Sequence, residues 1–302
     1  MHSRPPASAY AAALGMTAAF GLSFVATKYA LRGFEPLLVA LLRFSLAAAV
    51  LLLVWRLRPH RERATRADLG RLALLGFVSL TVYFSFENLG IARTSASAAS
   101  ILIGAIPVFT VILNHFTLRE PTGTRQWLGI GLSFAGIIAL VVSAGSASGG
   151  SLTGDLLVLA ASLSAAVYGL LARRILVSRS ALFVTAWQNA FGAVFMAPLA
   201  LVEALMVGVR EPTAQAAGGV LYLTVVCSIT AYLLLNYAFR FLSASRVSVF
   251  INLTPVVAVA AAYALLGERF TAGQAAAAGV VVAGVWLANS GAGGASRSPS
   301  GG

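Results

Sequence analysis

The chain has few charged side chains. Asp, Glu, Lys and Arg make up 10% of its 302 residues, whereas a soluble domain carries roughly 25%. Hydrophobic residues make up 59%, and the mean hydropathy is +0.88. Because so few polar side chains cannot cover a surface that faces water, the composition predicts a protein that lies within a lipid bilayer.

Cysteine, metal-ligand clusters and nucleotide-binding motifs are also missing. Cys227 is the single cysteine, which excludes a disulfide framework, and His2, His60 and His115 are too scattered for metal-ligand spacing. No G-x-x-x-x-G-K-[ST] loop or Ser/His/Asp constellation is present. We therefore expect no enzyme, no cofactor and no metal. The alternative class, a membrane-embedded enzyme or a structural membrane protein, would need clustered nucleophiles or a soluble regulatory domain.

The net charge of +12 follows the pattern of a membrane protein. With the N-terminus placed inside, fifteen Lys and Arg residues fall in inner segments and five in outer ones, and Arg43 alone lies within an apolar run. The positive-inside rule then places both termini in the cytoplasm of a protein of the cell membrane. The basic residues lie between apolar runs, so we expect a small-molecule substrate and lipid as partners, and no nucleic acid.

Apolar runs of about 20 residues are long enough to cross a bilayer. The first is too long for a signal peptide and leads directly into the second, so we interpret it as a retained helix. The tail at 291–302 has the composition of a flexible linker and is predicted to be cytoplasmic. We predict ten membrane-spanning helices, at about 9–31, 36–55, 71–92, 96–118, 124–144, 154–174, 181–203, 217–239, 246–266 and 273–290.

The sequence contains an internal repeat. Residues 95–110 and 243–258 are identical at seven of sixteen positions without a gap, an offset of 148 that also relates Asn88 to Asn236. Earlier spans align at an offset of 145, which relates Arg43 to Gln188. The chain therefore divides into a first five-helix unit at 9–144 and a second at 154–290.

Five spans per unit is an odd number, so the second unit must enter the membrane from the opposite side. The predicted fold is therefore an all-α membrane protein of ten helices in two inverted five-helix repeats. Many secondary transporters have this architecture, with the substrate site near mid-membrane at the interface of the repeats. Since one chain carries both halves, it is compatible with a monomer that works by rocking of the two repeats about a central cavity.

Several motifs resemble the EamA family of the drug/metabolite transporter superfamily, over about 9–290. They are Gly21-Leu-Ser-Phe, Arg43-Phe44, the segment from Glu87 to Ser97, the mid-helix Pro107 and Pro255, and the Leu-x-Glu endings at Glu120 and Glu268. Phe20 departs from the family, in which Trp often precedes the glycine. The resemblance implies alternating-access transport of an amino acid or related small metabolite, with export favoured. The alternative substrates are hydrophobic or cationic drugs.

Arg43 and Glu87 are the charges deepest in the predicted spans. A charge at the bilayer centre costs ~3 kcal/mol or more, so such residues usually face a cavity or one another. Arg43 is a candidate for binding a substrate carboxylate, and Glu87 for proton coupling. Alternatively, the two form a structural ion pair. Their counterparts Gln188 and Leu235 are uncharged.

Polar and aromatic residues within the spans complete the candidate site. Asn88 and Asn236 are equivalent positions, and each follows an aromatic residue by four, which places an amide and a ring on one helix face. Pro107 and Pro255 are predicted helix kinks, because proline removes a backbone hydrogen bond. Helix packing is the alternative role for all of these residues. With Arg43, the predicted substrate-binding residues are Tyr83, Asn88, Tyr168, Tyr232, Asn236 and Asn252.

Overall fold

The computed structural model describes residues 6–59, 62–118, 123–144, 151–176, 178–208, 210–242, 247, 250–251, 253–269 and 271–290. Within these ranges every regular element is a helix. The predicted tail at 291–302 and the candidate residue Asn252 lie outside the described residues. The elements are α1 (Ala7–Ala30), α2 (Pro36–Leu57), α3 (Arg66–Gly76), η1 (Phe77–Val82), α4 (Tyr83–Ile91), α5 (Ala96–Ile103), α6 (Ile106–Leu118), α7 (Thr124–Ala144), α8 (Leu152–Leu176), α9 (Ala181–Val207), α10 (Ala214–Tyr222), η2 (Leu223–Ala231), α11 (Tyr232–Phe241), α13 (Thr254–Leu266) and α14 (Ala272–Ser290).

Local sequence signals set several helix ends. Pro36 begins α2, a position where its missing N–H costs nothing. The hydroxyls of Ser95 and Ser180 cap α5 and α9 by accepting backbone N–H groups. Gly208 and Gly267 follow α9 and α13 with φ of +85° and +67°, a conformation that favours glycine.

Eight helical segments are long and apolar enough to cross a membrane, and their ranges follow the first eight predicted spans. α3, η1 and α4 form one of them and α10, η2 and α11 another, and α5 with α6 is counted as one at Ala96–Thr117. The last two predicted spans correspond to the shorter apolar helices α13 and α14. The all-helical fold with several apolar segments of membrane-spanning length is therefore confirmed, while the count of ten spans and their inverted arrangement stay predictions.

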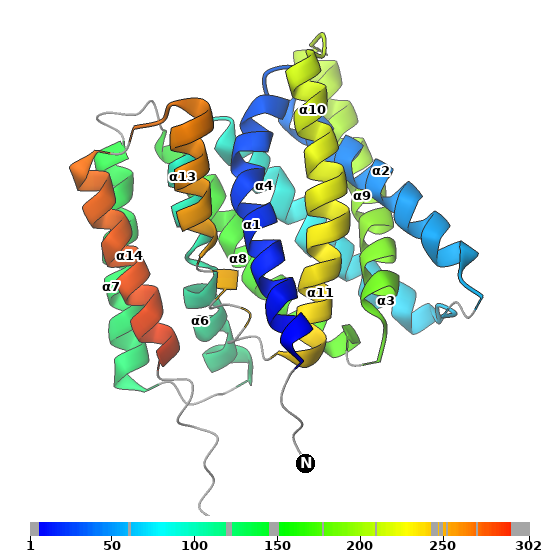
Figure 1. The fold of residues 1–302 in the computed structure, drawn as a ribbon, viewed down its shortest axis with the longest axis horizontal. Helices are drawn as coiled ribbons and strands as arrows, with labels where there is room; N and C mark the ends of the chain where they lie inside the picture. The colour runs from blue at the N-terminus through cyan, green and yellow to red at the C-terminus, as the bar shows by residue number, and fades with distance from the viewer. Residues whose placement is uncertain are drawn as a thin grey trace, which may run out of the picture.

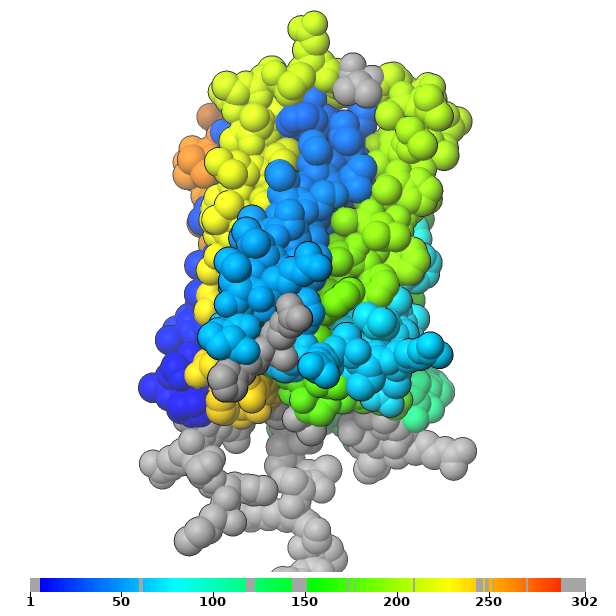
Figure 2. All heavy atoms as spheres, turned by 90° about the vertical axis from the view of Figure 1, so that its right-hand side faces the viewer, coloured from blue at the N-terminus to red at the C-terminus, as the bar shows by residue number. Residues whose placement is uncertain are grey.

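Two pairs of long helices lie at opposite ends of the bundle (Figure 1). One pair is α7 and α14, and the other is α2 and α9, which lie side by side in the space-filling view (Figure 2). Glycine permits the close approach of α7 and α14. A Cβ on Gly136 would lie 2.6 Å from the Val281 nitrogen, and one on Gly284 would lie too close to the Ser133 nitrogen. Gly136 and Gly284, like Ser133 and Val281, are related by the offset of 148.

The central helices interleave the two halves of the sequence. α1 packs against α10, η2, α11 and α13 of the second half, whereas α8 packs against α4, η1, α5 and α6 of the first. Each half therefore buries its first helix mainly against the other half. The start of α1 and the end of α14 lie at the same edge of the bundle (Figure 1), which we call the N-terminal edge.

Both halves contain a stretch of π-helix at equivalent positions. η1 spans Phe77–Val82 and η2 spans Leu223–Ala231, each directly before the helix that carries the central polar residues. The extra residue per turn of a π-helix rotates all later side chains around the helix axis, and such segments are frequent at functional sites. A second interruption separates α5 from α6 at Gly104 and Ala105, just before Pro107. Pro255 lies in the first turn of α13.

Candidate functional site

A cavity of about 150 Å³ lies at the centre of the bundle, much larger than the space of roughly 10–15 Å³ that one water molecule needs. Its wall is mostly apolar and aromatic, with a few polar groups, as is usual for small-molecule sites. α1, α4, α6, α8 and α11 supply most of the wall. The lining residues are Phe20, Ser23, Phe24, Arg43, Ser79, Tyr83, Phe84, Glu87, Ile103, Ile106, Thr110, Asn114, Ala165, Tyr168, Gly169, Leu170, Tyr232, Leu235, Phe239, Ile251 and Thr254.

Arg43 is the cation in this wall, and its side chain is 2% exposed. Its Nε donates a hydrogen bond of 2.9 Å to the Ser228 hydroxyl. The guanidinium carbon lies 4.4 Å from the centre of the Phe84 ring and 5.1 Å from that of Phe44, contacts that stabilise a buried cation. Among the described residues no hydrogen-bond partner occupies its two terminal nitrogens, so the fork that binds a carboxylate remains available.

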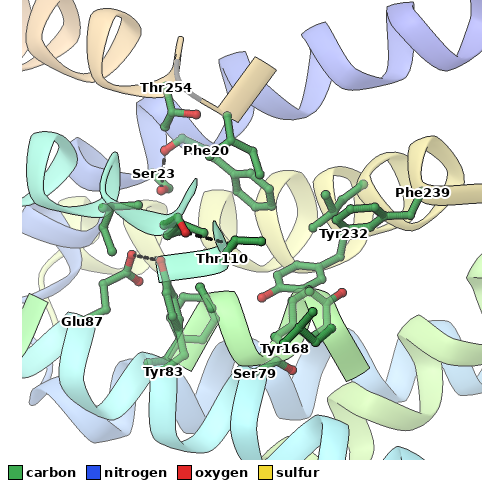
Figure 3. Close-up of a pocket in the computed structure, with 18 of the residues that line it drawn as sticks. Phe20, Ser23, Ser79, Tyr83, Glu87, Thr110, Tyr168, Tyr232, Phe239 and Thr254 are labelled. Atoms are coloured by element: carbon green, nitrogen blue, oxygen red, sulfur yellow. Dashed lines mark hydrogen bonds between the residues drawn. The ribbon is translucent and has the colours of Figure 1, made fainter. Parts of the chain in front are cut away.

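Glu87 is the acid in the same wall, and its exposed fraction is 5%. The Tyr83 hydroxyl donates a hydrogen bond of 2.7 Å to its Oε1 atom, as Figure 3 shows. No guanidinium nitrogen of Arg43 lies within 4.0 Å of a carboxylate oxygen of Glu87, so the two residues do not form an ion pair. Both charges therefore face the cavity without direct contact to one another, although an isolated charge is costly at this depth.

Tyr168 and Tyr232 face the cavity from the second half of the sequence, away from Tyr83 and Glu87 in Figure 3. Their ring centres are 6.4 Å apart, and Phe20 packs edge-on against Tyr232 at 5.7 Å. The Tyr168 hydroxyl donates to Asn236 Oδ1 at 3.1 Å, and Asn236 Nδ2 donates to the Thr185 hydroxyl at 2.8 Å. This buried chain of hydrogen bonds fixes the position of the Tyr168 ring.

Five of the predicted site residues thus meet at one cavity: Arg43, Tyr83, Glu87, Tyr168 and Tyr232. Asn88 and Asn236 lie behind the wall instead, and both are fully buried. Asn88 Nδ2 donates to the Pro36 carbonyl at 2.9 Å, which ties α4 to the start of α2. In this conformation the two amides contact protein rather than the cavity, and direct binding of substrate by them stays a prediction.

Most of the apolar wall was not predicted from the sequence, nor were its polar residues Ser23, Ser79, Thr110, Asn114 and Thr254. Thr110 donates to the Ile106 carbonyl of its own helix at 2.9 Å, so its hydroxyl is locally satisfied. One signal was available. Ile103, Ile106, Thr110 and Asn114 follow one another at spacings of three and four, which marks a single helical stripe.

The lining residues fall largely into equivalent pairs of the two halves. At the offset of 145 a large residue in one half corresponds to a small residue in the other, and at the offset of 148 most pairs match in size. The repeat thus relates positions of the wall, whereas their chemistry differs. The pairs are Phe20 and Ala165, Ser23 and Tyr168, Phe24 and Gly169, Phe84 and Tyr232, Glu87 and Leu235, Ile103 and Ile251, and Ile106 and Thr254.

A family model for EamA-like transporters matches the chain twice, over residues 7–142 and 152–290. The chain belongs to the EamA-like transporter family. An uncharacterized transporter of Archaeoglobus fulgidus is 28% identical over 91% of this chain and 96% of its own length. The uncharacterized transporter YcxC of Bacillus subtilis is 31% identical over 94% of this chain and 93% of its own. The EamA protein described here is therefore a membrane transporter and not an enzyme.

Two further likenesses are informative. A protein of Streptantibioticus cattleyicolor named "Probable terminal-alkyne amino-acid exporter" is 29% identical over 82% of this chain and 81% of its own length. A chain of known crystal structure superimposes with a TM-score of 0.67 at 18% identity, covering 95% of this EamA chain and 99% of that chain. The second likeness concerns the fold alone.

Proposed function

We propose that this EamA protein is a secondary transporter of zwitterionic small metabolites, an amino acid or a related compound, with export as its direction. The observation that carries the proposal is the presence of two opposite charges, Arg43 and Glu87, in one cavity without an ion pair between them. A zwitterion supplies the missing partner of each. The relative whose name describes an amino-acid exporter supports the same substrate class.

In this proposal the two charges have separate roles. The terminal nitrogens of Arg43 bind the substrate carboxylate, for which the planar guanidinium is well suited. Glu87, oriented by the Tyr83 hydroxyl, binds the ammonium group. Phe20, Tyr232 and other rings of the wall then surround the side chain of the substrate.

The repeat supports alternating access by an inverted-repeat architecture. Equivalent residues of the two halves line the same cavity, and equivalent glycines permit the close approach of α7 and α14. Because α1 and α8 pack mainly against the opposite half, we propose that the moving bodies combine helices of both halves. This replaces the expectation that the two repeats rock as separate units.

Location and assembly complete the proposal. In the described part of the chain, most Lys and Arg residues lie at or beside the helix ends of the N-terminal edge. We assign this edge to the cytoplasmic side of the cell membrane, with both termini in the cytoplasm, as the positive-inside rule favours. The described residues that line the cavity come from both halves of one chain, so a single chain can form the cavity, and we propose a monomer.

The cavity wall also favours a second candidate function, export of hydrophobic or cationic drugs. Its surface is mostly apolar and aromatic, and Glu87 supplies an acid for a cationic ligand. In that case Arg43, held by Ser228 and Phe84, has a structural role only.

One experiment separates the two functions. The purified protein is heated with a panel of amino acids, nucleosides and cationic dyes, and each stabilising compound is then tested for counterflow in proteoliposomes. We expect stabilisation and counterflow by an amino acid, both lost in Arg43→Ala. The matched control is Arg32→Ala, because Arg32 is exposed and does not line the cavity. Stabilisation by lipophilic cations alone, lost in Glu87→Gln, would contradict the proposal.

A further inference from the structure

The cavity is extended towards one edge of the bundle only. For some lining residues, the equivalent residue of the other half does not line the cavity. Four of these residues lie on the parts of α6, α8 and α11 that run to the N-terminal edge: Thr110, Asn114, Leu170 and Phe239. Their sequence counterparts lie towards the opposite edge, where they are buried together in one apolar cluster. These counterparts are Ala258, Ala262, Val25 and Ile91.

The apolar cluster thus closes the cavity on the side away from the N-terminal edge, where the symmetry of the repeat would otherwise predict a second opening. Phe24, Leu102 and Ala258 belong to it, and their exposed fractions are 2%, 0% and 0%. Leu102 directly precedes Ile103 of the cavity wall. The cluster therefore begins where the cavity ends and fills the space towards the edge away from the N-terminus.

Glu268 joins two helices above this cluster. It follows Gly267 at the end of α13, and its carboxylate reaches the start of α5. Oε1 accepts a hydrogen bond of 3.0 Å from the Ala96 amide, and Oε2 accepts bonds of 3.0 Å and 2.7 Å from the amide and hydroxyl of Ser97. Hydrogen bonds to an ionised acceptor are roughly twice as strong as neutral ones, so this contact holds α13 against α5.

Lys28 of α1 adds a second link at the same place. Its ammonium group donates to the Thr94 carbonyl, immediately before α5, and is attracted by the Glu268 carboxylate. The Thr94 hydroxyl in turn donates to Asp155 of α8 at 2.7 Å. Side chains therefore tie α1, α5, α8 and α13 together at the edge opposite the N-terminus.

We propose that Glu268, with Ser97 and Lys28, is the latch that keeps the cavity closed on the edge away from the N-terminus. Its release frees α13 from α5 and lets the apolar cluster part, so that substrate passes on that side. This inference rests on the proposed alternating access, in which a state closed at one edge must convert into a state closed at the other.

A labelling experiment tests the latch without requiring transport. Ser100 lies one turn below Ser97, is fully buried and precedes the cavity residue Ile103 by three positions. In a Cys227→Ser background, Ser100→Cys supplies a single reporter thiol. A charged, membrane-impermeant maleimide is applied to oriented vesicles from each side. With Glu268→Gln we expect labelling from the edge away from the N-terminus to rise about tenfold, which corresponds to ~1.4 kcal/mol.

Glu203→Gln is the matched control. Its carboxylate also caps a helix start, accepting from the amides of Leu37 at 2.8 Å and Leu38 at 3.2 Å, but it joins α9 to α2 rather than α13 to α5. We expect this variant to leave the labelling rate unchanged. A smaller change, Ser97→Ala, removes only the 2.7 Å hydroxyl bond, and we expect a rise of about threefold.

The outcomes are distinct. Faster labelling in Glu268→Gln and in Ser97→Ala, with an unchanged labelling rate in Glu203→Gln, supports the latch. No increase in either latch variant, or an equal increase in all three, overturns it. If the Glu268 variant does not fold, the Ser97 variant decides. Counterflow by the parent protein is measured separately, so a failed latch leaves the proposed transport standing, and failed transport shows in the parent protein.

Discussion

The two halves of the cavity wall occupy equivalent positions and yet differ in chemistry. The first half supplies Arg43, Tyr83 and Glu87, whereas the second supplies Tyr168 and Tyr232. Leu235, the counterpart of Glu87, also lines the wall, but Gln188, the counterpart of Arg43, is buried outside the cavity. The duplicated fold therefore fixes where side chains can reach the cavity, and the charge lies on one side only. If the substrate is a zwitterion, as proposed, this asymmetry gives it a single orientation in the cavity.

Replacing Glu87 by the residue of the other half is expected to have the largest effect. Glu87→Leu copies Leu235 and removes the proposed ammonium partner. Loss of one partner of a buried charge pair costs ~2–5 kcal/mol, so affinity for an amino acid should fall by about 100-fold. The affinity for the deaminated analogue, which keeps the carboxylate of the amino acid but lacks its amino group, should be unchanged. Inhibition of counterflow by the two compounds measures both values.

The comparison between the two compounds is the internal control. Equal losses for the amino acid and its deaminated analogue would show that Glu87 supports the site without binding the ammonium group. A lower melting temperature of the variant with unchanged affinity for both compounds would show that the Glu87 carboxylate has a structural role alone.

The sequence predicts the membrane fold well, because an apolar run of about 20 residues matches the thickness of the hydrocarbon core of a bilayer. It also identifies Arg43 and Glu87, since charges within such runs usually face a cavity or one another. Apolar lining residues such as Phe20 and Ile103 are different. They have the same composition as residues that pack against neighbouring helices or lipid, so only the structure assigns them to the wall.

Which face of a helix points to the cavity is harder to predict. Counting four residues placed Asn236 on the face of Tyr232, but in the structure Leu235 and Phe239 share the wall with Tyr232, and Asn236 lies behind it. Both residues of the counted pair lie within α11, after η2, so the π-helical turn does not come between them. At 3.6 residues per turn, the third and the fourth residue after a given position lie on opposite sides of it, and the cavity lies on the side of Leu235 and Phe239. A count of four does not tell which of the two sides lines the cavity.

The comparison between halves extends to α7 and α14, where the two surfaces remain alike. A Cβ at Gly284 would meet the backbone of Ser133, so Gly284→Ala should force these helices apart and destabilise the fold by ~1–3 kcal/mol. Substrate affinity should stay the same, because neither helix contributes a lining residue. Thermal unfolding and ligand-induced stabilisation measure the two quantities on one sample.

Gly279→Ala is the matched control on the same helix. A Cβ at Gly279, or at its counterpart Gly131, would have nothing within 4 Å, so stability should not fall. If Gly284→Ala weakened binding as strongly as it lowered stability, the α7 and α14 pair would be coupled to the cavity rather than a separate support.

The smallest expected effect concerns the tyrosine side of the wall. Tyr168 and Tyr232 both face the cavity, but only Tyr168 has a hydrogen bond in the described part of the chain, to Asn236 at 3.1 Å. Such bonds between membrane helices contribute ~0.6 kcal/mol on average. Tyr168→Phe should therefore weaken substrate binding by about threefold, because the ring loses its anchor, while Tyr232→Phe should change it less. Counterflow at graded substrate concentrations measures the difference. A larger loss in Tyr232→Phe would mean that its hydroxyl binds the substrate directly, and the polar contacts of the ligand would then come from both halves of the wall.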